Sequence, residues 1–166
     1  IPLDHRLPCC GYLFREKPTK PHIRRDMVDF YGIPVSQLNN IKAGQDYVTP
    51  DGDVIDNSRL VLPADPPRSY AYCSDTRYMP KLAARLSGVN TLYHEATYGD
   101  DNELLATKYY HSTARQAAKV ASDAGVQQLI IGHYSSRYTD ENVLLRQALE
   151  VVPRTFLAAD NKVFDV

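Results

Sequence analysis

Residues 111–138 carry the strongest structural signal in the chain and read HSTARQAAKVASDAGVQQLIIGHYSSRY. Thr113 and Gln116 have the spacing of a capping box, in which two side chains satisfy free backbone N–H groups at the start of a helix. Four apolar residues then recur with helical spacing and form one stripe: Ala117, Val120, Ala121 and Ala124. Because Gly125 is a typical left-handed C-terminal stop, the pattern predicts a helix that begins after Thr113 and ends at Gly125.

A short apolar strand is expected directly after this helix. Leu129, Ile130 and Ile131 form a run that is too short and too apolar to lie anywhere but in the interior. The strand leads to His133. In open α/β sheets, ligands bind outside the carboxyl ends of the strands. The segment therefore places His111 at a helix start and His133 at a strand end, which is the arrangement of a functional site.

Length and composition indicate one soluble globular domain. The chain has 166 residues, of which 43% are hydrophobic and 23% charged, and its net charge is −1. It contains neither a membrane-length apolar run nor a secretory leader pattern, and it lacks the global basic field of many nucleic-acid binders. Three cysteines without metal-type spacing favour a reduced, cytoplasmic protein. The chain opens at Ile1 without a methionine, so we expect a fragment or a processed product.

Strands and helices alternate along most of the chain, which predicts α/β layers. Strands are expected at residues 11–16, 69–74, 90–93 and 129–131, helices at 78–87, 103–109 and 140–150, and a terminal pair of strands at 155–159 and 162–166.

Residues 18–62 have a different character and look like an excursion from this core. A Pro-broken basic link enters the excursion, and a second Pro-rich link leaves it after Leu62. Two short helices are expected, one at 26–31 closed by Gly32 and one from Pro34 to Gly44. A hairpin turn is expected at residues 50–52. Residues 13–25 carry five basic residues and one acidic residue, a local charge of +4.

Polar residues with metal-binding or acid–base chemistry gather at the predicted strand ends. Asp75, the pair His94–Glu95 and His133 each follow a strand, while His111 begins a helix and His5 lies at a turn. Imidazole nitrogens and a bridging carboxylate are ligands that borderline cations such as zinc prefer. In a two-metal hydrolase such ions activate water and stabilise the oxygens of a phosphodiester. From the residues alone, a metallohydrolase-like site is a plausible prediction.

Each of these residues also has a structural interpretation. Asp75 before Thr76 could be a helix N-cap, and His111 could cap the helix that follows it. His133 could be a hydrogen-bonded core histidine, and His94–Glu95 a buried polar pair. The basic run could be a solvated face, and His5 in isolation indicates almost nothing.

Several motifs in the same order resemble the C-terminal half of the ribonuclease Z family. They are Tyr93-His94-Glu95-Ala96-Thr97, residues 111–118 (HSTARQAA) and residues 129–138 (LIIGHYSSRY). Residues 73–77 (CSDTR) match the family's Gly-Asp-Thr segment with serine in place of glycine, and Pro2-Leu3-Asp4-His5 resembles a stretch with a metal histidine. The resemblance covers essentially the whole chain. It implies a tRNA 3′-processing endonuclease and an α/β fold, specifically half of a metallo-β-lactamase αββα sandwich with an inserted exosite arm.

The resemblance assigns roles to individual residues. It implies that Asp75 bridges two Zn²⁺ ions, that His5 binds one ion and that His133 binds the other. His111 is expected to act at the phosphate and Glu95 to orient it. Arg137 and Ser135 are expected to position groups near the site, whereas His94 is expected to be structural.

The resemblance also assigns the excursion and the partners. Residues 18–62 correspond to the family's flexible arm, and we expect RNA phosphate contacts from basic residues: Lys17, Lys20, Arg24, Arg25 and Arg137. The arm departs from the family pattern because its Gly-Pro-rich element is reduced to residues 32–37 (GIPVSQ). Precursor tRNA is the implied substrate, with no DNA or membrane partner, and a cytoplasmic homodimer is the implied assembly.

The family's His-x-His-x-Asp-His signature does not occur in these 166 residues. We therefore expect an incomplete metal shell, inactivity of this chain alone and a need for the N-terminal half of the enzyme. Two other functions are compatible with the sequence. One is a related hydrolase of small phosphodiesters or esters, which would ignore tRNA. The other is a non-catalytic tRNA-binding half, for which no companion segment with the signature would exist.

Overall fold

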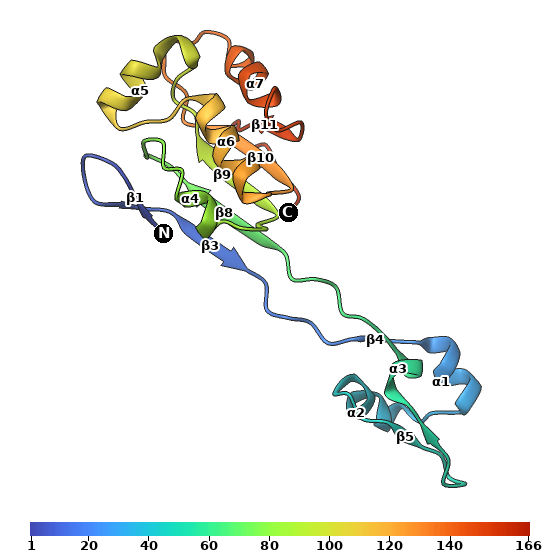
Figure 1. Cartoon of the computed structure of the whole chain (residues 1–166). Helices are drawn as coiled ribbons and strands as arrows, with labels where there is room; N and C mark the ends of the chain where they lie inside the picture. The colour runs from blue at the N-terminus through green and yellow to red at the C-terminus, as the bar shows by residue number, and fades with distance from the viewer. The chain divides into compact units, whose positions relative to one another are not determined.

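The computed structural model describes residues 1–166 and divides the chain into two compact units. The first, called here the sheet unit, comprises residues 1–15 and 68–166, and the second, the inserted unit, comprises residues 16–67. Figure 1 shows both along the chain. The excursion expected at 18–62 falls within the inserted unit.

A five-stranded sheet organises the sheet unit. Its strand order is β11-β10-β9-β8-β3. The strands are β3 (Tyr12–Arg15), β8 (Ser69–Cys73), β9 (Thr91–Glu95), β10 (Gln128–Gly132) and β11 (Thr155–Leu157). β8, β9, β10 and β11 run parallel, and β3 pairs antiparallel with β8 at one edge. β10 is buried along its whole length, as its apolar sequence predicted.

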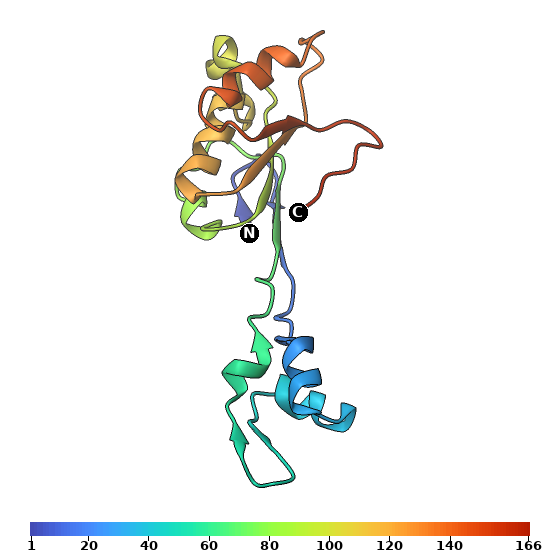
Figure 2. The same cartoon turned by 90° about the vertical axis from the view of Figure 1, so that its right-hand side faces the viewer.

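The helices of the sheet unit cover one face of the sheet, and Figure 2 shows them on one side of the strands. They are α4 (Leu82–Arg85), α5 (Glu103–Tyr109), α6 (Ala114–Ala124) and α7 (Asn142–Leu149), with a 3-10 turn η2 (Asp100–Asn102) before α5. α6 has the predicted capping box, since the Thr113 hydroxyl accepts from Gln116 N and the Gln116 side chain accepts from Thr113 N. Gly125 ends α6 at a φ of 65°. These predictions are confirmed.

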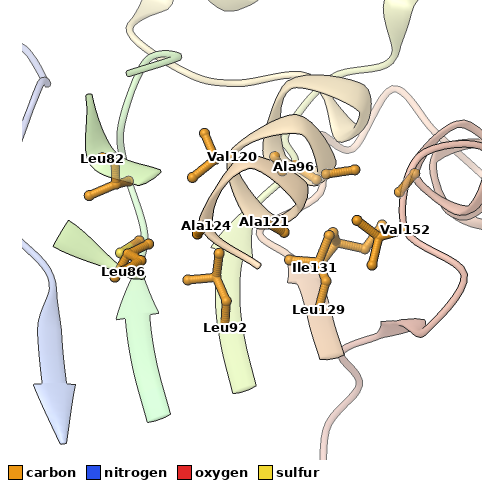
Figure 3. Close-up of a cluster of buried hydrophobic side chains, with 14 of the residues drawn as sticks. Leu82, Leu86, Leu92, Ala96, Val120, Ala121, Ala124, Leu129, Ile131 and Val152 are labelled. Carbon is orange, nitrogen blue, oxygen red and sulfur yellow. The ribbon is translucent and has the colours of Figure 1, made fainter. Parts of the chain in front are cut away.

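The main hydrophobic core lies between the sheet and α4, α6 and α7. Figure 3 shows the stripe of α6 above Leu92 of β9 and the pair Leu129 and Ile131 of β10. Val120 and Ala121 of α6 are fully buried there. The stripe packs α6 against the strands. The bridge between Tyr98 and Thr113 and the hydrogen bond from Ser112 N to Glu95 hold the N-terminus of α6 beside the carboxyl end of β9.

Two predicted elements of the sheet unit differ in the structure. The helix expected at 78–87 covers only Leu82–Arg85, because residues 79–82 form a tight turn in which Leu82 N donates to Met79 O. The strand expected at 162–166 does not form. Instead, the Gln128 side-chain amide donates to the carbonyl of Asp165, and Phe164 packs beside Phe156.

A short antiparallel ribbon, β1 (Pro2–Leu3) with β2 (Cys9–Cys10), completes the sheet unit and was not predicted. The loop between its strands carries His5. The Gly11 N–H donates to the carbonyl of Ile1 and extends the ribbon. Gly11 also lies against β8, because a Cβ atom there would overlap the carbonyl of Tyr72.

The inserted unit has its own small core and short elements. They are β4 (His22–Ile23), α1 (Arg25–Tyr31), η1 (Val35–Gln37), α2 (Leu38–Lys42), β5 (Tyr47–Val48), β6 (Val54–Ile55), α3 (Asn57–Leu60) and β7 (Val61–Leu62). Gly32 closes α1 in the left-handed conformation, and β5 and β6 form the expected hairpin. Pairing of β4 with β7 and the helix α3 were not predicted. No helix anywhere in the chain is long and apolar enough to cross a membrane.

Candidate active site at the strand ends

The parallel strands bring the candidate residues together at one edge of the sheet. The register pairs Cys73 of β8 with His94 of β9, and Glu95 of β9 with Gly132 of β10. Asp75 follows β8, Glu95 ends β9 and His133 follows β10. Residues far apart in sequence therefore share the carboxyl edge of the sheet, where α/β folds place ligands.

Asp75 and His133 leave their strands through a backbone conformation that side chains rarely adopt. Their φ angles are 56° and 59°, both in the left-handed region. Such positions cost on the order of 1–3 kcal/mol and cluster at functional sites. The two turns direct the side chains at each other, so that His133 Nε2 lies 3.0 Å from Asp75 Oδ1.

Gly132 is required where β10 ends. A Cβ atom there would overlap the hydroxyl and ring of Tyr93 on the neighbouring strand. The absence of a side chain allows Tyr93 to lie against β10, and His133 follows directly.

Glu95 is a fully buried carboxylate surrounded by four donors from three segments of the chain. Its Oε1 accepts from Thr76 N and from His111 Nδ1, both at 2.8 Å, and its Oε2 accepts from Thr97 Oγ1 at 2.7 Å and Ser112 N at 3.0 Å. Burial alone would raise the pKa of Glu95. The hydrogen bonds from His111, Ser112 and Thr97 outweigh burial, so the pKa of Glu95 is lowered and the group is an anion.

His111 is the hydrogen-bond partner of this anion. The hydrogen bond to Glu95 raises the pKa of His111, and this effect exceeds the opposing effect of partial burial. The His111 ring stacks beside the His133 ring at 5.3 Å and lies 5.3 Å from the His5 ring. Since Nδ1 is held by Glu95, the other ring nitrogen is free to hold a metal or to carry a proton to a substrate.

Thr97 links the two histidines and was missed in the sequence analysis. Its hydroxyl donates to Glu95, and it lies 2.9 Å from His133 Nδ1 and 3.4 Å from His111 Nδ1. Because the hydroxyl proton is committed to Glu95, Thr97 accepts from His133 Nδ1–H. In a neutral ring this leaves the lone pair of His133 on Nε2, where it faces a carboxylate oxygen of Asp75 at 3.0 Å. Two acceptors in contact repel each other, so a proton or a cation between them is needed to make the contact favourable. The only feature of the sequence that could have indicated this role of Thr97 is its place two residues after Glu95, the last residue of a strand.

A family model described as a β-lactamase superfamily domain matches residues 29–134, which is more than half of the chain. The chain belongs to the β-lactamase superfamily. A curated protein of Bacteroides fragilis named ribonuclease Z is 58% identical over 161 residues, which cover 97% of this chain and 53% of that protein. A ribonuclease Z of Porphyromonas gingivalis is 45% identical over 166 residues, covering 100% of this chain and 55% of that protein.

These comparisons confirm the resemblance to ribonuclease Z, and the chain spans about half the length of the curated relatives it matches. A solved structure, the metallo-β-lactamase fold protein YhfI from Bacillus subtilis, aligns with a TM-score of 0.51 at 20% identity, covering 55% of this chain and 37% of that one. The likeness to YhfI shows the fold. Together with the mixed sheet and its helical layer, it confirms the predicted α/β class.

The donor set of this superfamily site fits a zinc ion. Ligand atoms of Asp75, His111 and His133 all lie within 4.8 Å of one another. One carboxylate and two imidazoles match the donors that zinc prefers. His5 lies outside this set, although its ring is adjacent to His111 and its Nδ1 is 3.1 Å from Tyr110 O.

The remaining predicted residues do not join this cluster. His94 is fully buried, its Nδ1–H donates to the Glu95 carbonyl at 2.7 Å, and burial lowers the pKa of His94. Arg137 is exposed in the loop after β10, whose Ser135 N donates to Thr97 O at 3.0 Å. The four other predicted RNA contacts belong to the inserted unit: Lys17, Lys20, Arg24 and Arg25. Of these, Arg24 pairs with Asp26 at 2.7 Å.

Proposed function

We propose that this chain is part of a zinc-dependent endoribonuclease that removes the 3′ trailer from precursor tRNA and leaves a 3′-hydroxyl on the tRNA. The observation that carries the proposal is the buried Glu95–His111 ion pair beside the Asp75–His133 contact. The names of the Bacteroides and Porphyromonas relatives support the choice of RNA as substrate.

His111 is the residue best placed to transfer a proton. Hydrolysis adds water to the phosphorus and breaks its bond to the 3′ oxygen of the tRNA, which must gain a proton as it leaves. Glu95 favours the protonated form of His111 and orients its ring, because the carboxylate binds Nδ1 and leaves the opposite nitrogen for the substrate. Asp75 and His133 of the cluster would hold zinc together with His5, whose ring lies beside His111. His111 belongs to the same cluster but would serve as the acid, because its Nδ1 is already bound by Glu95. Zinc, when bound, would supply positive charge that activates water and stabilises anionic oxygens.

The inserted unit would contact RNA phosphates. Lys17, Lys20, Arg24 and Arg25 lie in its first ten residues, and phosphate contacts come mainly from such cations. Arg137 would make a further contact near the cleavage site. Binding through these groups would weaken steeply with salt, because each neutralised phosphate releases counterions.

The complete site needs ligands that this chain does not contain, so we propose that the chain alone is inactive. A companion polypeptide with the His-x-His-x-Asp-His signature would supply the rest of the zinc ligands. The uncovered face of the five-stranded sheet supports such a partner, because it carries the exposed aromatic residues Tyr12, Phe14, Tyr72 and Phe156. Assembly as a homodimer in the cytoplasm belongs to the same proposal.

A complementation assay tests the proposal. The chain is mixed with the remaining part of the Bacteroides fragilis relative, and zinc content and cleavage of a 5′-labelled precursor tRNA are measured. We expect little zinc or cleavage with either part alone, about two zinc ions per complex as a two-metal site requires, and a product ending in a 3′-hydroxyl.

Three variants of the chain distinguish loss of zinc binding from loss of cleavage. Asp75→Ala should lose zinc and cleavage, whereas His111→Ala should lose cleavage but keep most of the zinc. Lys119→Ala, at an exposed position on α6, should behave as the unchanged chain. A zinc-free mixture would overturn the ligand assignment, and hydrolysis of a small phosphodiester without tRNA cleavage would favour the related small-substrate hydrolase.

A further inference from the structure

Arg77 and Tyr110 form a stacked pair just outside the candidate site. The Arg77 guanidinium carbon lies 3.9 Å from the centre of the Tyr110 ring. Arg77 follows the Asp75 turn by two residues, and Tyr110 directly precedes His111. A guanidinium over an aromatic ring is attracted by the negative face of the ring, most strongly where water is partly excluded. Arg77 is only about one-third exposed, with a side-chain exposure of 34%.

The same arginine is joined to the loop that carries His5. Arg77 N donates to the carbonyl of Asp4 at 2.9 Å, and Arg77 Nε lies 3.6 Å from Asp4 Oδ2. Asp4 N in turn donates to Thr76 Oγ1 at 3.2 Å. Three links therefore connect residue 4 with residues 76 and 77, immediately beside His5.

Tyr110 completes the connection through its backbone. Its carbonyl lies 3.1 Å from His5 Nδ1, and its φ of 64° is in the left-handed region. A carbonyl oxygen only accepts hydrogen bonds, so His5 Nδ1 must carry the proton in this contact. The lone pair of His5 is then on Nε2, the nitrogen left free to bind a metal.

We propose that Arg77 and Tyr110 act as a clasp that positions His5 and fixes its Nδ1–H tautomer. Arg77 is a positioning residue, because it acts through Tyr110 and Asp4. The stack holds Tyr110 in its left-handed conformation, which directs the carbonyl at His5, and the Asp4 links hold the His5 loop against the same arginine. The value of this tautomer for zinc binding rests on the proposed function, whereas the clasp itself does not.

The test is the tautomer of His5 in the metal-free chain. Long-range ¹H–¹⁵N correlation spectra of histidine-labelled protein at about pH 8, where neutral imidazole prevails, distinguish Nδ1–H from Nε2–H. His5→Gln assigns the signals. We expect the Nδ1–H form to dominate in the unchanged chain and to become a minority in Arg77→Gln and in Tyr110→Ala. Arg77→Lys keeps the cation and should restore part of the Nδ1–H population.

Two control variants isolate the stack from general effects. Arg59→Ala removes a second arginine–tyrosine contact, 5.6 Å over the Tyr31 ring in the inserted unit, and should leave the His5 spectrum unchanged. Tyr110→Phe keeps the ring and should also match the unchanged chain. Unaltered far-UV circular dichroism in each variant establishes that the fold is intact.

A second readout connects the clasp to metal binding. In the complex with the companion polypeptide, Arg77→Gln should weaken zinc affinity about 10–100-fold, the usual effect of losing a group that orients a histidine ligand. The clasp is overturned if His5 keeps the Nδ1–H tautomer in both Arg77→Gln and Tyr110→Ala. If the unchanged complex binds no zinc or leaves tRNA intact, the proposed function fails, and the tautomer measurement still decides the clasp.

Discussion

The chain contains the same histidine–carboxylate contact in two different surroundings. His111 Nδ1 lies 2.8 Å from Glu95 in the sheet unit, and His22 Nε2 lies 2.9 Å from Asp65 in the inserted unit. The side-chain exposures are 15% and 0% for the first pair but 53% and 81% for the second. Distance alone does not distinguish them. Burial does, because a buried charge must be compensated by its neighbours, whereas an exposed one is solvated by water.

The hydrogen bonds that offset the buried charge of Glu95 also suit the Glu95–His111 pair to acid–base chemistry. The carboxylate is held by backbone N–H groups of Thr76 and Ser112 and by the Thr97 hydroxyl, so its position does not depend on His111 alone. A fixed carboxylate partner sets the orientation and the tautomer of a histidine. Four predictions test this contrast, from the largest expected effect to the smallest.

Glu95→Gln should destabilise the sheet unit by about 3–5 kcal/mol, the cost of removing one member of a buried ion pair. The amide of glutamine carries no charge to offset that of His111. Its NH₂ group is a donor and cannot accept the hydrogen bonds that the glutamate oxygens accept. Urea unfolding followed by far-UV circular dichroism measures the effect, since the chain has no tryptophan. A loss below about 1 kcal/mol would place this pair in the same class as exposed pairs.

The stabilising effect of the pair should depend on pH in a defined window. The lowered pKa of Glu95 makes its contribution present above the ordinary value of about 4.5 and lost as pH falls through the lowered pKa. The raised pKa of His111 makes its contribution present below the ordinary value of about 6.5 and lost as pH rises through the raised pKa. The difference in unfolding free energy between the metal-free chain and Glu95→Gln should therefore be largest between these two values. A difference that stays constant across pH would contradict the ion pair.

Thr97→Val should cost about 1–3 kcal/mol, because it leaves Glu95 Oε2 and His133 Nδ1 each short of a buried partner. Thr97→Ser retains the hydroxyl and is the matched control. We expect the valine variant, and not the serine variant, to change the His133 tautomer in ¹⁵N spectra. Equal behaviour of the two variants would show that the methyl group rather than the hydroxyl matters.

Asp65→Asn should change the unfolding free energy by no more than about 0.5 kcal/mol, as for other exposed ion pairs. The measurement is the same urea titration used for Glu95→Gln, with His22→Gln as the companion variant. A loss comparable to that of Glu95→Gln would remove the distinction between the two pairs and would show that contact geometry outweighs burial.

Local signals in the sequence determined the elements that position the site. The capping box at Thr113, the small-residue stripe of α6 and the stop at Gly125 depend on residues close together in the chain. The sequence alone therefore predicts the start, the buried face and the end of this helix. The apolar run at 129–131 predicted β10 for the same reason. Residue patterns also predicted that side chains with metal-binding and acid–base chemistry follow the strands. The resemblance to a known family then supplied the role proposed for each of these side chains.

Tertiary structure decided what depends on distant neighbours. The helix expected at 78–87 is shortened and the strand expected at 162–166 is replaced by side-chain contacts with Gln128 and Phe156. Thr97 gained its importance only because the sheet register brings it beside His133, which is 36 residues away. Asp and His adopt the left-handed conformation more often than most side chains, but this preference is too weak to single out Asp75 and His133 from the sequence. Contacts from the surrounding structure must hold the two turns. Short-range hydrogen bonds and hydrophobic periodicity can be predicted from the sequence, because they involve neighbouring residues. Burial and contacts between distant segments are determined only when the chain packs into its tertiary structure.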